Sequence, residues 1–359
     1  MSDLDAMSGL GITSGLGSGP KVKVGVIGAG AWGTALAMHT ARMGHETLIW
    51  AREEQVVKDI NEARENKIFL PGFSVPERLH ASSDIAEVVR FADPLLLSVV
   101  PTPHVAGVIG GVIEHLDDRH LICSCSKGIL NDTLETVDEI LQRVLPRRFH
   151  SALCFLSGPS FAKEVAAAIP TAVTVASHIA SVAVETQHLM SSSQFRFRCY
   201  ASRDVVGVEM GGALKNVMAI ATGAADGLGF GHNARAALIT RGLAEITKLA
   251  VRKGANPLTL QGLAGMGDLV LTCTGDLSRN RQVGLRLGRG ERLSDITGSA
   301  VTVAEGVLTT RSAWMLAEQL GVDVPIIENC YRVLYEDLPL LDALQNLMER
   351  PLGSELQLG

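Results

Sequence analysis

The sequence predicts an α/β fold, a doubly wound parallel sheet followed by an all-α C-terminal part. Short apolar runs alternate with helix-like stretches up to about residue 203, a pattern typical of parallel sheets with helices on both faces. From Asp204 onward, Ala, Leu, Met and Gly recur with helical periodicity and strand-like runs cease. The 359 residues, 47% of them hydrophobic, suffice for two domains. We expect a flexible leader at 1–20, a sheet domain at 21–203 and a helical domain at 204–359.

The expected strands are short apolar or alternating runs, and the last two are expected to extend the same sheet. They lie at 22–27, 46–50, 95–100, 121–125, 153–156, 172–176 and 195–200. Helix-like stretches such as 85–91 and 134–145 separate them. In the helical part, Pro257, Pro325 and Pro339 are expected at element boundaries, because proline cannot continue a helix from inside.

The first expected strand runs into the glycine pattern GAGAWG at 28–33 and then a helix-like stretch. In such a strand, turn and helix, Gly28 makes the tight turn, Gly30 lets the backbone approach a pyrophosphate, and Gly33 allows close packing of helix on strand. Amide groups at the helix start then face an anion. An ordinary glycine turn would share these letters, but the flanking elements favour a dinucleotide site and a Rossmann-type sheet.

The end of the second expected strand indicates which dinucleotide fits. An NAD site usually places an acidic residue there to bind the ribose 2′-hydroxyl, whereas this chain has Arg52 before Glu53 and Glu54. Arg52 is suited to a 2′-phosphate, which favours NADP over NAD. The alternative is that Arg52 lies in solvent while Glu53 reaches the ribose.

Composition excludes several classes of partner. A net charge of −6 and a pI near 5.9 arise from interspersed charges, so the sequence has no basic patch suited to nucleic acid or an anionic membrane.

The uncharged segment 94–113 is interrupted by Pro101 and Pro103, which favours a buried strand and turn over a membrane span. Residues 1–20 lack the features of signal and transit peptides. The six cysteines lack metal-ligand spacing, which indicates reduced thiols. We therefore expect a cytoplasmic protein. Cys123 and Cys125 should share one face of a strand, because side chains two residues apart point the same way.

Two junctions at the expected strand ends carry groups suited to an anionic substrate. Lys127 follows the strand that ends at Cys125, and its ammonium would project into the crevice formed by the carboxyl ends of the strands. A solvated surface lysine is the alternative. Gly158 and Ser160 follow the next strand, with Ser160 placed to cap a short helix. The amides of that turn could face a phosphate or the nicotinamide.

Further candidates lie in the helical part. Lys215, followed by Asn216, stands inside an apolar helix, where desolvation moves a lysine pKa toward neutrality as an acid/base requires; a snorkelling lysine is the alternative. Asp268 follows a glycine turn and could orient Lys215 or simply cap a helix. Thr272 and the run SRNR at 278–281 offer a polar cap and two guanidinium groups for a phosphate, unless that helix start is solvated.

Taken together, these motifs closely resemble NAD(P)-dependent glycerol-3-phosphate dehydrogenase of the bacterial and organellar type. The resemblance covers about 23–347, with Ser126 where the family usually has Thr. It rests on GAGAWGTALA at 28–37, Ser126-Lys127-Gly128, SGPSFAKE at 157–164, GGALKNVMAIATGAADGLGFGHNARAALITRGLAE at 211–245, GLAGMGDLVLTC at 262–273 and SRNR at 278–281.

The resemblance implies a role for each site residue. Lys215 would be the catalytic acid/base, with Lys127 polarising a carbonyl and Asp268 tuning Lys215. Substrate contacts are expected from Lys127, Gly158, Ser160, Asn216, Asp268, Thr272, Ser278, Arg279 and Asn280. Cofactor contacts are expected from Gly28, Gly30, Ala31, Trp32, Gly33, Arg52, Lys127, Ala162, Arg279, Val303 and Glu305.

The implied reaction is reversible hydride transfer between NAD(P)H and dihydroxyacetone phosphate, giving sn-glycerol 3-phosphate for glycerophospholipid synthesis. No metal is expected, because ammonium groups can do the polarising. The expected partner is a phosphorylated small molecule, and a homodimer is possible. Two alternatives stay open: another two-domain β-hydroxyacid-type dehydrogenase, and a non-catalytic NADP-sensing protein.

Overall fold

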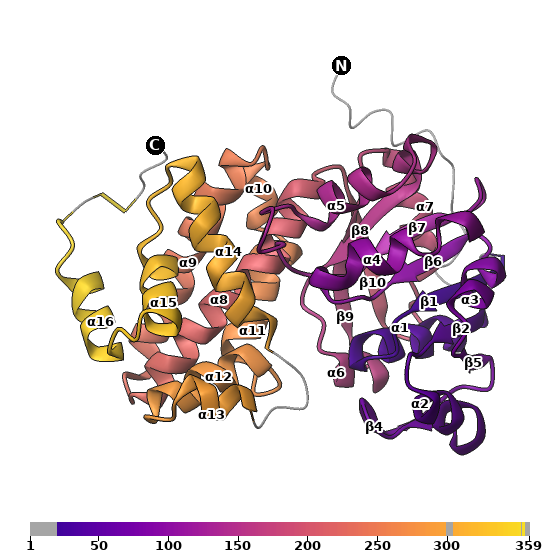
Figure 1. The fold of residues 1–359 in the computed structure, drawn as a ribbon, viewed down its shortest axis with the longest axis horizontal. Coiled ribbons are helices and arrows are strands. Elements are labelled where there is room, and N and C mark those ends of the chain that lie inside the picture. The colour runs from indigo at the N-terminus through magenta and orange to yellow at the C-terminus, as the bar shows by residue number, and fades with distance from the viewer. Residues whose placement is uncertain (1–19, 299–303, 353, 356–359) are drawn as a thin grey trace.

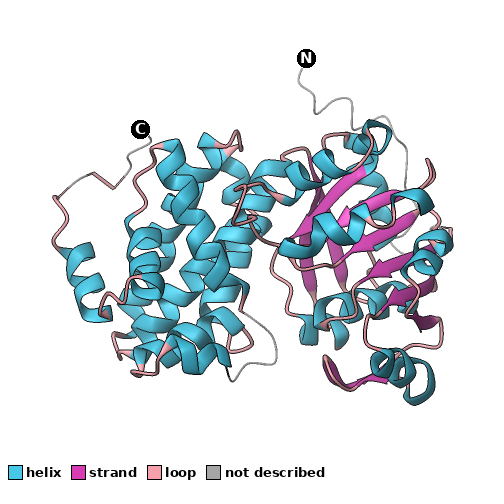
Figure 2. Cartoon of the chain, viewed as in Figure 1, coloured by secondary structure: helices cyan, strands magenta, loops and turns pink. Residues whose placement is uncertain are grey.

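The computed structural model describes residues 20–298, 304–352 and 354–355. All of the expected leader except Pro20 lies outside these residues. One half of the molecule, indigo to magenta in Figure 1, is built around a sheet, and the other half, orange to yellow, is helical. Figure 2 shows the strands gathered in the first half, and within the described residues none follows Ser202. The predicted fold class is confirmed.

The main sheet has eight strands in the order β10-β9-β8-β7-β6-β1-β2-β5. All neighbouring pairs are parallel except β8 with β9. The strand bounds are β1 Lys23–Ile27, β2 Glu46–Trp50, β5 Leu79–Ser82, β6 Leu95–Ser98, β7 Leu121–Ser124, β8 Leu153–Ser157, β9 Thr171–Ala176 and β10 Phe197–Ser202. A two-stranded ribbon, β3 Glu65–Asn66 and β4 Leu70–Ser74, lies outside this sheet.

Helices cover both faces of the sheet, which makes it doubly wound. Apolar side chains of α1, α6 and α7 pack on one face, and those of α3, α4 and α5 pack on the other. The helices of this half are α1 Ala31–Arg42, α2 Glu54–Lys58, α3 Ile85–Phe91, α4 Val105–Gly110, α5 Val137–Val144, α6 Ala162–Ala166 and α7 Ala180–Met190. The central strands β6, β7 and β8 are buried on both faces, which explains why their sequences are continuous apolar runs rather than alternating ones.

The helical half is organised around the long helix α8, whose apolar side chains form a core with those of α9, α14 and α15. The Asp204 carboxylate caps α8 by accepting the Gly207 N–H at 2.9 Å. The helices are α8 Val205–Gly227, α9 Gly231–Arg252, α10 Pro257–Leu260, α11 Asp268–Thr274, α12 Arg279–Gly288, α13 Leu293–Gly298, α14 Glu305–Leu320, α15 Pro325–Tyr335 and α16 Leu340–Met348. A π-helical turn, Leu263–Gly267, leads directly into α11.

Each of the seven predicted strands is present within two residues of its expected bounds, and the last two do extend the sheet. Pro257 and Pro325 occupy first helical turns, and Pro339 precedes α16, as predicted. The sequence did not indicate β5, which is four residues long and obtains its stability from pairing with β2. It also did not indicate the antiparallel join of β8 and β9, because strand direction depends on the chain path and not on local composition.

The uncharged segment 94–113 forms β6, a short 3₁₀ turn and α4, as the two prolines predicted. Across the described part of the chain, no helix combines the length and the apolar character that crossing a membrane requires. The six cysteines are buried and unpaired, and Cys123 and Cys125 pack into the same apolar cluster on one face of the sheet.

Candidate active site

The glycine turn after β1 has the geometry that each predicted task requires. Gly28 adopts φ +115°, and a Cβ there would lie 2.6 Å from the Val99 carbonyl oxygen beside the end of β6. A Cβ at Gly33 would lie 1.8 Å from the Gly28 oxygen, so only glycine lets α1 pack this closely. A Cβ at Gly30 would meet no atom of the described chain within 4 Å. The turn therefore leaves open space in front of Gly30, at the point where the strand order reverses.

The start of α1 supplies further features that fit a dinucleotide. Gly30 is the N-cap, and no side chain caps this helix end, so the helix dipole remains available to an anion. Ala31 and Trp32 form the first turn and are partly exposed. The indole Nε1 of Trp32 is buried without a hydrogen-bond partner among the described residues. A pyrophosphate-containing ligand would fit the open space at the glycine turn, and it would give the indole N–H a hydrogen-bond acceptor.

Arg52 extends from the end of β2 as predicted, with its side chain 82% exposed. Its guanidinium donates to the Glu53 carboxylate at 3.1 Å. The two residues that the sequence offered as alternatives for the ribose thus lie side by side and partly neutralise each other.

Three charged side chains, Lys127, Lys215 and Asp268, meet between the two halves of the molecule. Lys127 follows β7 and donates to Asp268 Oδ2 at 2.8 Å and to the Gly158 carbonyl oxygen at 3.1 Å. Lys215, in the middle of α8, forms a hydrogen-bonded ion pair with Asp268 Oδ1. Asp268 is the first residue of α11 and is 1% exposed. The structure therefore brings together the three side chains for which the resemblance implies catalytic roles.

Burial and mutual charge shift the pKa values of this cluster in opposite senses. Burial lowers the pKa of Lys215 to about 8, with Asp268 opposing the shift and the positive charge of Lys127 adding to it. Burial alone would raise the pKa of Asp268, but the ammonium groups of Lys127 and Lys215 hold it below its ordinary value. Lys215 is thus a buried amine that can change protonation state near neutral pH, beside a carboxylate that stays ionised.

The loop after β8 lies against this cluster. Gly158 adopts φ +137°, and Ser160 donates its hydroxyl to the Gly158 oxygen at 2.9 Å. The expectation that Ser160 caps a helix is wrong, because α6 begins one residue later than that role requires and Phe161 is its N-cap. Ala162 is the first residue of α6. The Ser157 hydroxyl is buried and has no hydrogen-bond partner among the residues that the structure describes. A Cβ at Gly212 would lie 2.4 Å from this hydroxyl, so Gly212 lets α8 approach β8.

The other predicted substrate residues lie on α8, α11 and α12. Thr272, one turn after Asp268, donates to the Asp268 backbone oxygen at 2.6 Å. Asn216 is buried next to Lys215, and its carbonyl oxygen lies close to Gly306 at the start of α14. Ser278 caps α12, as predicted, by accepting the Arg281 N–H at 3.2 Å.

The first turn of α12 faces the start of α14. Arg279 is exposed there, and Asn280 Oδ1 accepts the Gly306 N–H at 2.9 Å. Burial raises the pKa of Glu305, while the positive charges of Arg279, Lys127 and Lys215 oppose that shift. Glu305 therefore lies within electrostatic reach of the Lys127 and Lys215 side chains, although it is distant from both in sequence. Val303, the remaining predicted cofactor residue, lies outside the described residues.

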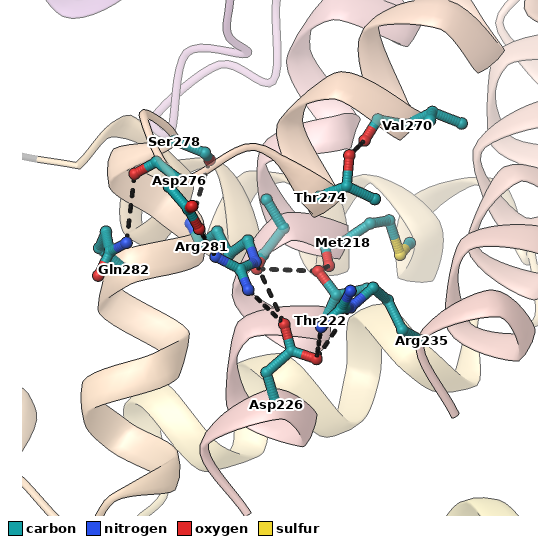
Figure 3. A network of polar contacts seen from close by, with 11 residues as sticks. Met218, Thr222, Asp226, Arg235, Val270, Thr274, Asp276, Ser278, Arg281 and Gln282 are labelled. Atoms are coloured by element: carbon teal, nitrogen blue, oxygen red, sulfur yellow. Dashed lines mark hydrogen bonds and ion pairs between the residues drawn. The ribbon is translucent and has the colours of Figure 1, made fainter. Parts of the chain in front are cut away.

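The expectation that Arg279 and Arg281 form a guanidinium pair for one phosphate is wrong for Arg281. Figure 3 shows the Arg281 guanidinium bound to the carboxylates of Asp226 and Asp276. No role was predicted for Asp226, although it lies within the motif at 211–245, 55 residues before Arg281. The signal that could have identified Asp226 is its charge, because it stands among small, uncharged residues near the end of a predicted helix.

Between 20 and 355, in the residues described, no group of three or more His, Cys, Asp or Glu side chains could hold a metal. A Rossmann-type sheet with an open glycine turn, and a lysine–aspartate–lysine cluster where this sheet meets a helical half, define the class of two-domain nicotinamide-dependent dehydrogenases.

Comparisons with known proteins identify the family. Residues 23–183 match the family model of the NAD-dependent glycerol-3-phosphate dehydrogenase N-terminus, and residues 204–345 match that of the C-terminus. A glycerol-3-phosphate dehydrogenase [NAD(P)+] of Geobacter sp. (strain M21) is 53% identical over 93% of this chain and 98% of its own length. Its namesake in Myxococcus xanthus (strain DK1622) is 51% identical over 92% and 98%. The chain belongs to the NAD-dependent glycerol-3-phosphate dehydrogenase family.

Solved structures agree with this membership. A crystal structure of glycerol-3-phosphate dehydrogenase from Coxiella burnetii matches with a TM-score of 0.85 and 37% identity, over 92% of this chain and 99% of that one. D-mandelate dehydrogenase, at 12% identity and a TM-score of 0.57, shares the fold alone.

Proposed function

We propose that this protein is an NAD(P)-dependent sn-glycerol-3-phosphate dehydrogenase, which interconverts dihydroxyacetone phosphate and sn-glycerol 3-phosphate. The observation that carries this proposal is the buried cluster in which Lys127 and Lys215 bind the two oxygens of Asp268. The names of the family and of relatives about 50% identical support the same reaction. The product is the backbone unit from which glycerophospholipids are made.

In this proposal Lys215 moves the proton at C2 of the substrate. In reduction its ammonium protonates the oxygen that develops negative charge, and in oxidation its neutral amine removes the hydroxyl proton. A pKa of about 8 makes both protonation states accessible near neutral pH. When bound, the nicotinamide supplies or accepts the hydride.

Lys127 and Asp268 support this step from either side. The Lys127 ammonium polarises the carbonyl oxygen and stabilises its developing charge. Asp268 orients Lys215 and stabilises its protonated form. Since the cluster contains two cations and one anion, it retains a net positive charge that suits an oxyanion.

The phosphate of the substrate is proposed to lie at the start of α12. Ser278, Arg279 and Asn280 form this turn, and the guanidinium of Arg279 supplies the charge for an anion at a helix N-terminus. The remaining proposed substrate contacts lie next to the lysine cluster, in the loop after β8 and on α8 and α11: Gly158, Ser160, Asn216 and Thr272.

The dinucleotide is proposed to lie along the glycine turn and the end of β2. Gly28, Gly30 and Gly33 shape the turn, Ala31 and Trp32 face the pyrophosphate, and Arg52 favours NADP over NAD. Further contacts are assigned to Lys127, Ala162, Arg279, Val303 and Glu305. This assignment makes 21–203 the dinucleotide domain and 204–359 the substrate domain. We also propose a cytoplasmic location and a homodimeric state, in keeping with a small phosphorylated substrate.

One assay tests the proposed reaction. Purified protein is mixed with NADPH or NADH and dihydroxyacetone phosphate, and the loss of absorbance of the reduced nicotinamide is followed. Turnover that requires the phosphorylated ketone supports the proposal. Turnover only with a sugar acid would favour a different hydroxyacid dehydrogenase, and binding of NADPH without turnover of any substrate would indicate a sensor.

A further inference from the structure

The first turn of α12 depends on a buried anion that lies on another helix. We propose that Asp226, in the last turn of α8, is a positioning residue that fixes the substrate's phosphate site. It does so by holding Arg281, the residue that anchors the turn carrying Ser278 and Arg279. This inference rests on the function proposed above, because it assigns the phosphate to that turn.

Four hydrogen bonds link the Asp226 carboxylate to two guanidinium groups (Figure 3). Arg281 donates from Nε and Nη2 to Oδ2 at 3.2 and 2.7 Å. Arg235 of α9 donates from Nε and Nη2 to Oδ1 at 2.9 and 2.7 Å. Both oxygens are therefore occupied, and Asp226 joins α8, α9 and α12 at one point.

Arg281 in turn holds the segment before α12 from two sides. Its Nη1 donates to Asp276 Oδ1 at 2.9 Å, and its backbone N–H donates to the Ser278 hydroxyl at 3.2 Å. One residue thus ties down the chain from 276 to 281, which contains Arg279 and Asn280. Moving the Arg281 guanidinium would release this turn from α8.

The network of two arginines and two aspartates does not bind the ligand itself, as its burial and its net charge indicate. Asp226 and Arg281 have side chains only 6% and 9% exposed. The two arginines and two aspartates cancel, so the network adds no net charge to the phosphate site. Its contribution to binding is geometric, since a buried carboxylate bound by two guanidinium groups has a fixed orientation.

The backbones of α8 and α12 touch, which explains why one side chain can set their relative position. A Cβ at Gly223 would lie 2.1 Å from the Arg281 oxygen, and a Cβ at Gly284 would lie 2.0 Å from the Ile220 oxygen. Lys215 precedes Asp226 by eleven residues in the same helix, which is about 16 Å along its axis. The Asp226–Arg281 pair therefore sets the position of the phosphate turn relative to Lys215.

The experiment compares Asp226→Asn with wild type on two substrates, dihydroxyacetone phosphate and unphosphorylated dihydroxyacetone. We expect KM for the phosphorylated ketone to rise about tenfold, the change that follows from weakening one charge-assisted hydrogen bond. We expect kcat to stay within about twofold and kcat/KM for dihydroxyacetone to stay unchanged, because the unphosphorylated ketone makes no contact with the phosphate turn. The ratio of the two kcat/KM values should therefore fall about tenfold.

Asp276→Asn is the matched control, because Asp276 binds the same guanidinium with a side chain 90% exposed. Exposed pairs contribute little, so its substrate ratio should remain within about twofold of wild type. If Asp226→Asn does not fold, Arg281→Lys is the substitute variant. It keeps the positive charge but loses the bidentate contact with Asp226, so we expect it to lower the same ratio of kcat/KM values.

The outcomes distinguish this inference from the proposed function. If wild type turns over dihydroxyacetone phosphate but the variant has an unchanged ratio with a lower melting temperature, Asp226 is merely structural and the inference is wrong. An equal loss of kcat/KM on both substrates would overturn it as well. If wild type does not reduce dihydroxyacetone phosphate with either nucleotide, the proposed function fails first, and the inference fails with it.

Discussion

Lys215 and Asp268, which lie 53 residues apart in the sequence, form an ion pair in which both side chains are buried. A lysine in the middle of an apolar helix is costly unless an anion compensates its charge. Asp268 supplies that anion from the first residue of α11, and its second oxygen binds Lys127 from the sheet half. One carboxylate thus serves two ammonium groups from different halves of the molecule.

Replacing Lys215 tests its role in proton transfer. We expect Lys215→Ala to lower kcat by about a hundredfold to ten-thousandfold, the usual contribution of a general acid or base. NADPH affinity and melting temperature should remain close to wild type, since Lys215 is not among the proposed cofactor contacts. Steady-state kinetics together with fluorescence titration of NADPH checks this. Near wild-type kcat, or a loss explained entirely by unfolding, would transfer the acid role to Lys127.

The pKa of Lys215 predicts the pH dependence of both directions. Reduction needs the ammonium form, so its kcat should fall as pH rises through about 8, whereas oxidation needs the amine and should rise over the same range. Asp268→Asn removes the anion that stabilises the ammonium, so both transitions should move to lower pH and kcat should fall. Profiles of kcat against pH in both directions measure this. Unmoved profiles in the Asn variant would show that Asp268 does not tune Lys215.

Arg279 is predicted to recognise the phosphate. Arg279→Ala should weaken use of dihydroxyacetone phosphate by about tenfold to a hundredfold, which corresponds to roughly 1.5 to 3 kcal/mol for a hydrogen bond to a charged group. The unphosphorylated ketone, already a poor substrate, should be almost unaffected. Measuring kcat/KM for the two ketones tests this prediction. An equal loss on both would mean that Arg279 is only a structural or cofactor-binding residue and does not recognise the phosphate.

Arg52 is predicted to favour NADP(H) over NAD(H). Because its guanidinium is paired with Glu53, we expect opposite effects from the two neighbours. Arg52→Ala should reduce the preference for NADPH by about tenfold to a hundredfold, and Glu53→Gln should increase it by leaving Arg52 available to the 2′-phosphate. The measurement is kcat/KM for each nucleotide at fixed ionic strength. Equal use of both nucleotides, unchanged in Arg52→Ala, contradicts this prediction.

Glu209 of α8 is predicted to make folding stability depend on pH. Burial and the nearby negative charge of Asp138 raise its pKa to about 8 from 4.5, and its Oε2 has no hydrogen-bond partner within the described chain. Between these values the folded chain holds a proton that the unfolded chain has released, so stability is lost as pH rises toward 8. Glu209→Gln should remove this loss and raise the unfolding free energy at pH 8 by about 2 to 4 kcal/mol. Denaturant unfolding from pH 5 to 8 checks it; a difference independent of pH contradicts it.

Local sequence was sufficient for much of the sheet half. Gly33 is required by its contact with the Gly28 oxygen, and Gly28 by its own positive φ, so the spacing within the strand, turn and helix predicts the turn. The same holds for Ser278, whose capping bond reaches only three residues along the chain. Strand boundaries were also predictable, because burial on both faces leaves continuous apolar runs.

Features that depend on distant partners could not be predicted in this way. Arg281 looks like a phosphate ligand until its position opposite Asp226 is known, and that position depends on how α8 and α12 pack. Ser160 has the composition of a helix cap, but its hydroxyl bonds within its own turn instead. The ion pair between Lys127 and Asp268 was not predicted: the resemblance implied a substrate contact for each residue, but nothing local in either segment specifies the other.

Redesign of the substrate pocket is constrained by the glycines at which α8 and α12 touch. A methyl group at Gly288 would lie 2.4 Å from the Ala224 oxygen, and one at Gly227 would lie 2.5 Å from the Leu285 oxygen. Even alanine at these sites would push the helices apart and carry Arg279 away from Lys215. An engineer who wants the enzyme to accept bulkier phosphorylated ketones should therefore trim side chains that line the pocket. Displacing α12 outward would instead change the distance between Arg279 and Lys215, on which the proposed reaction depends.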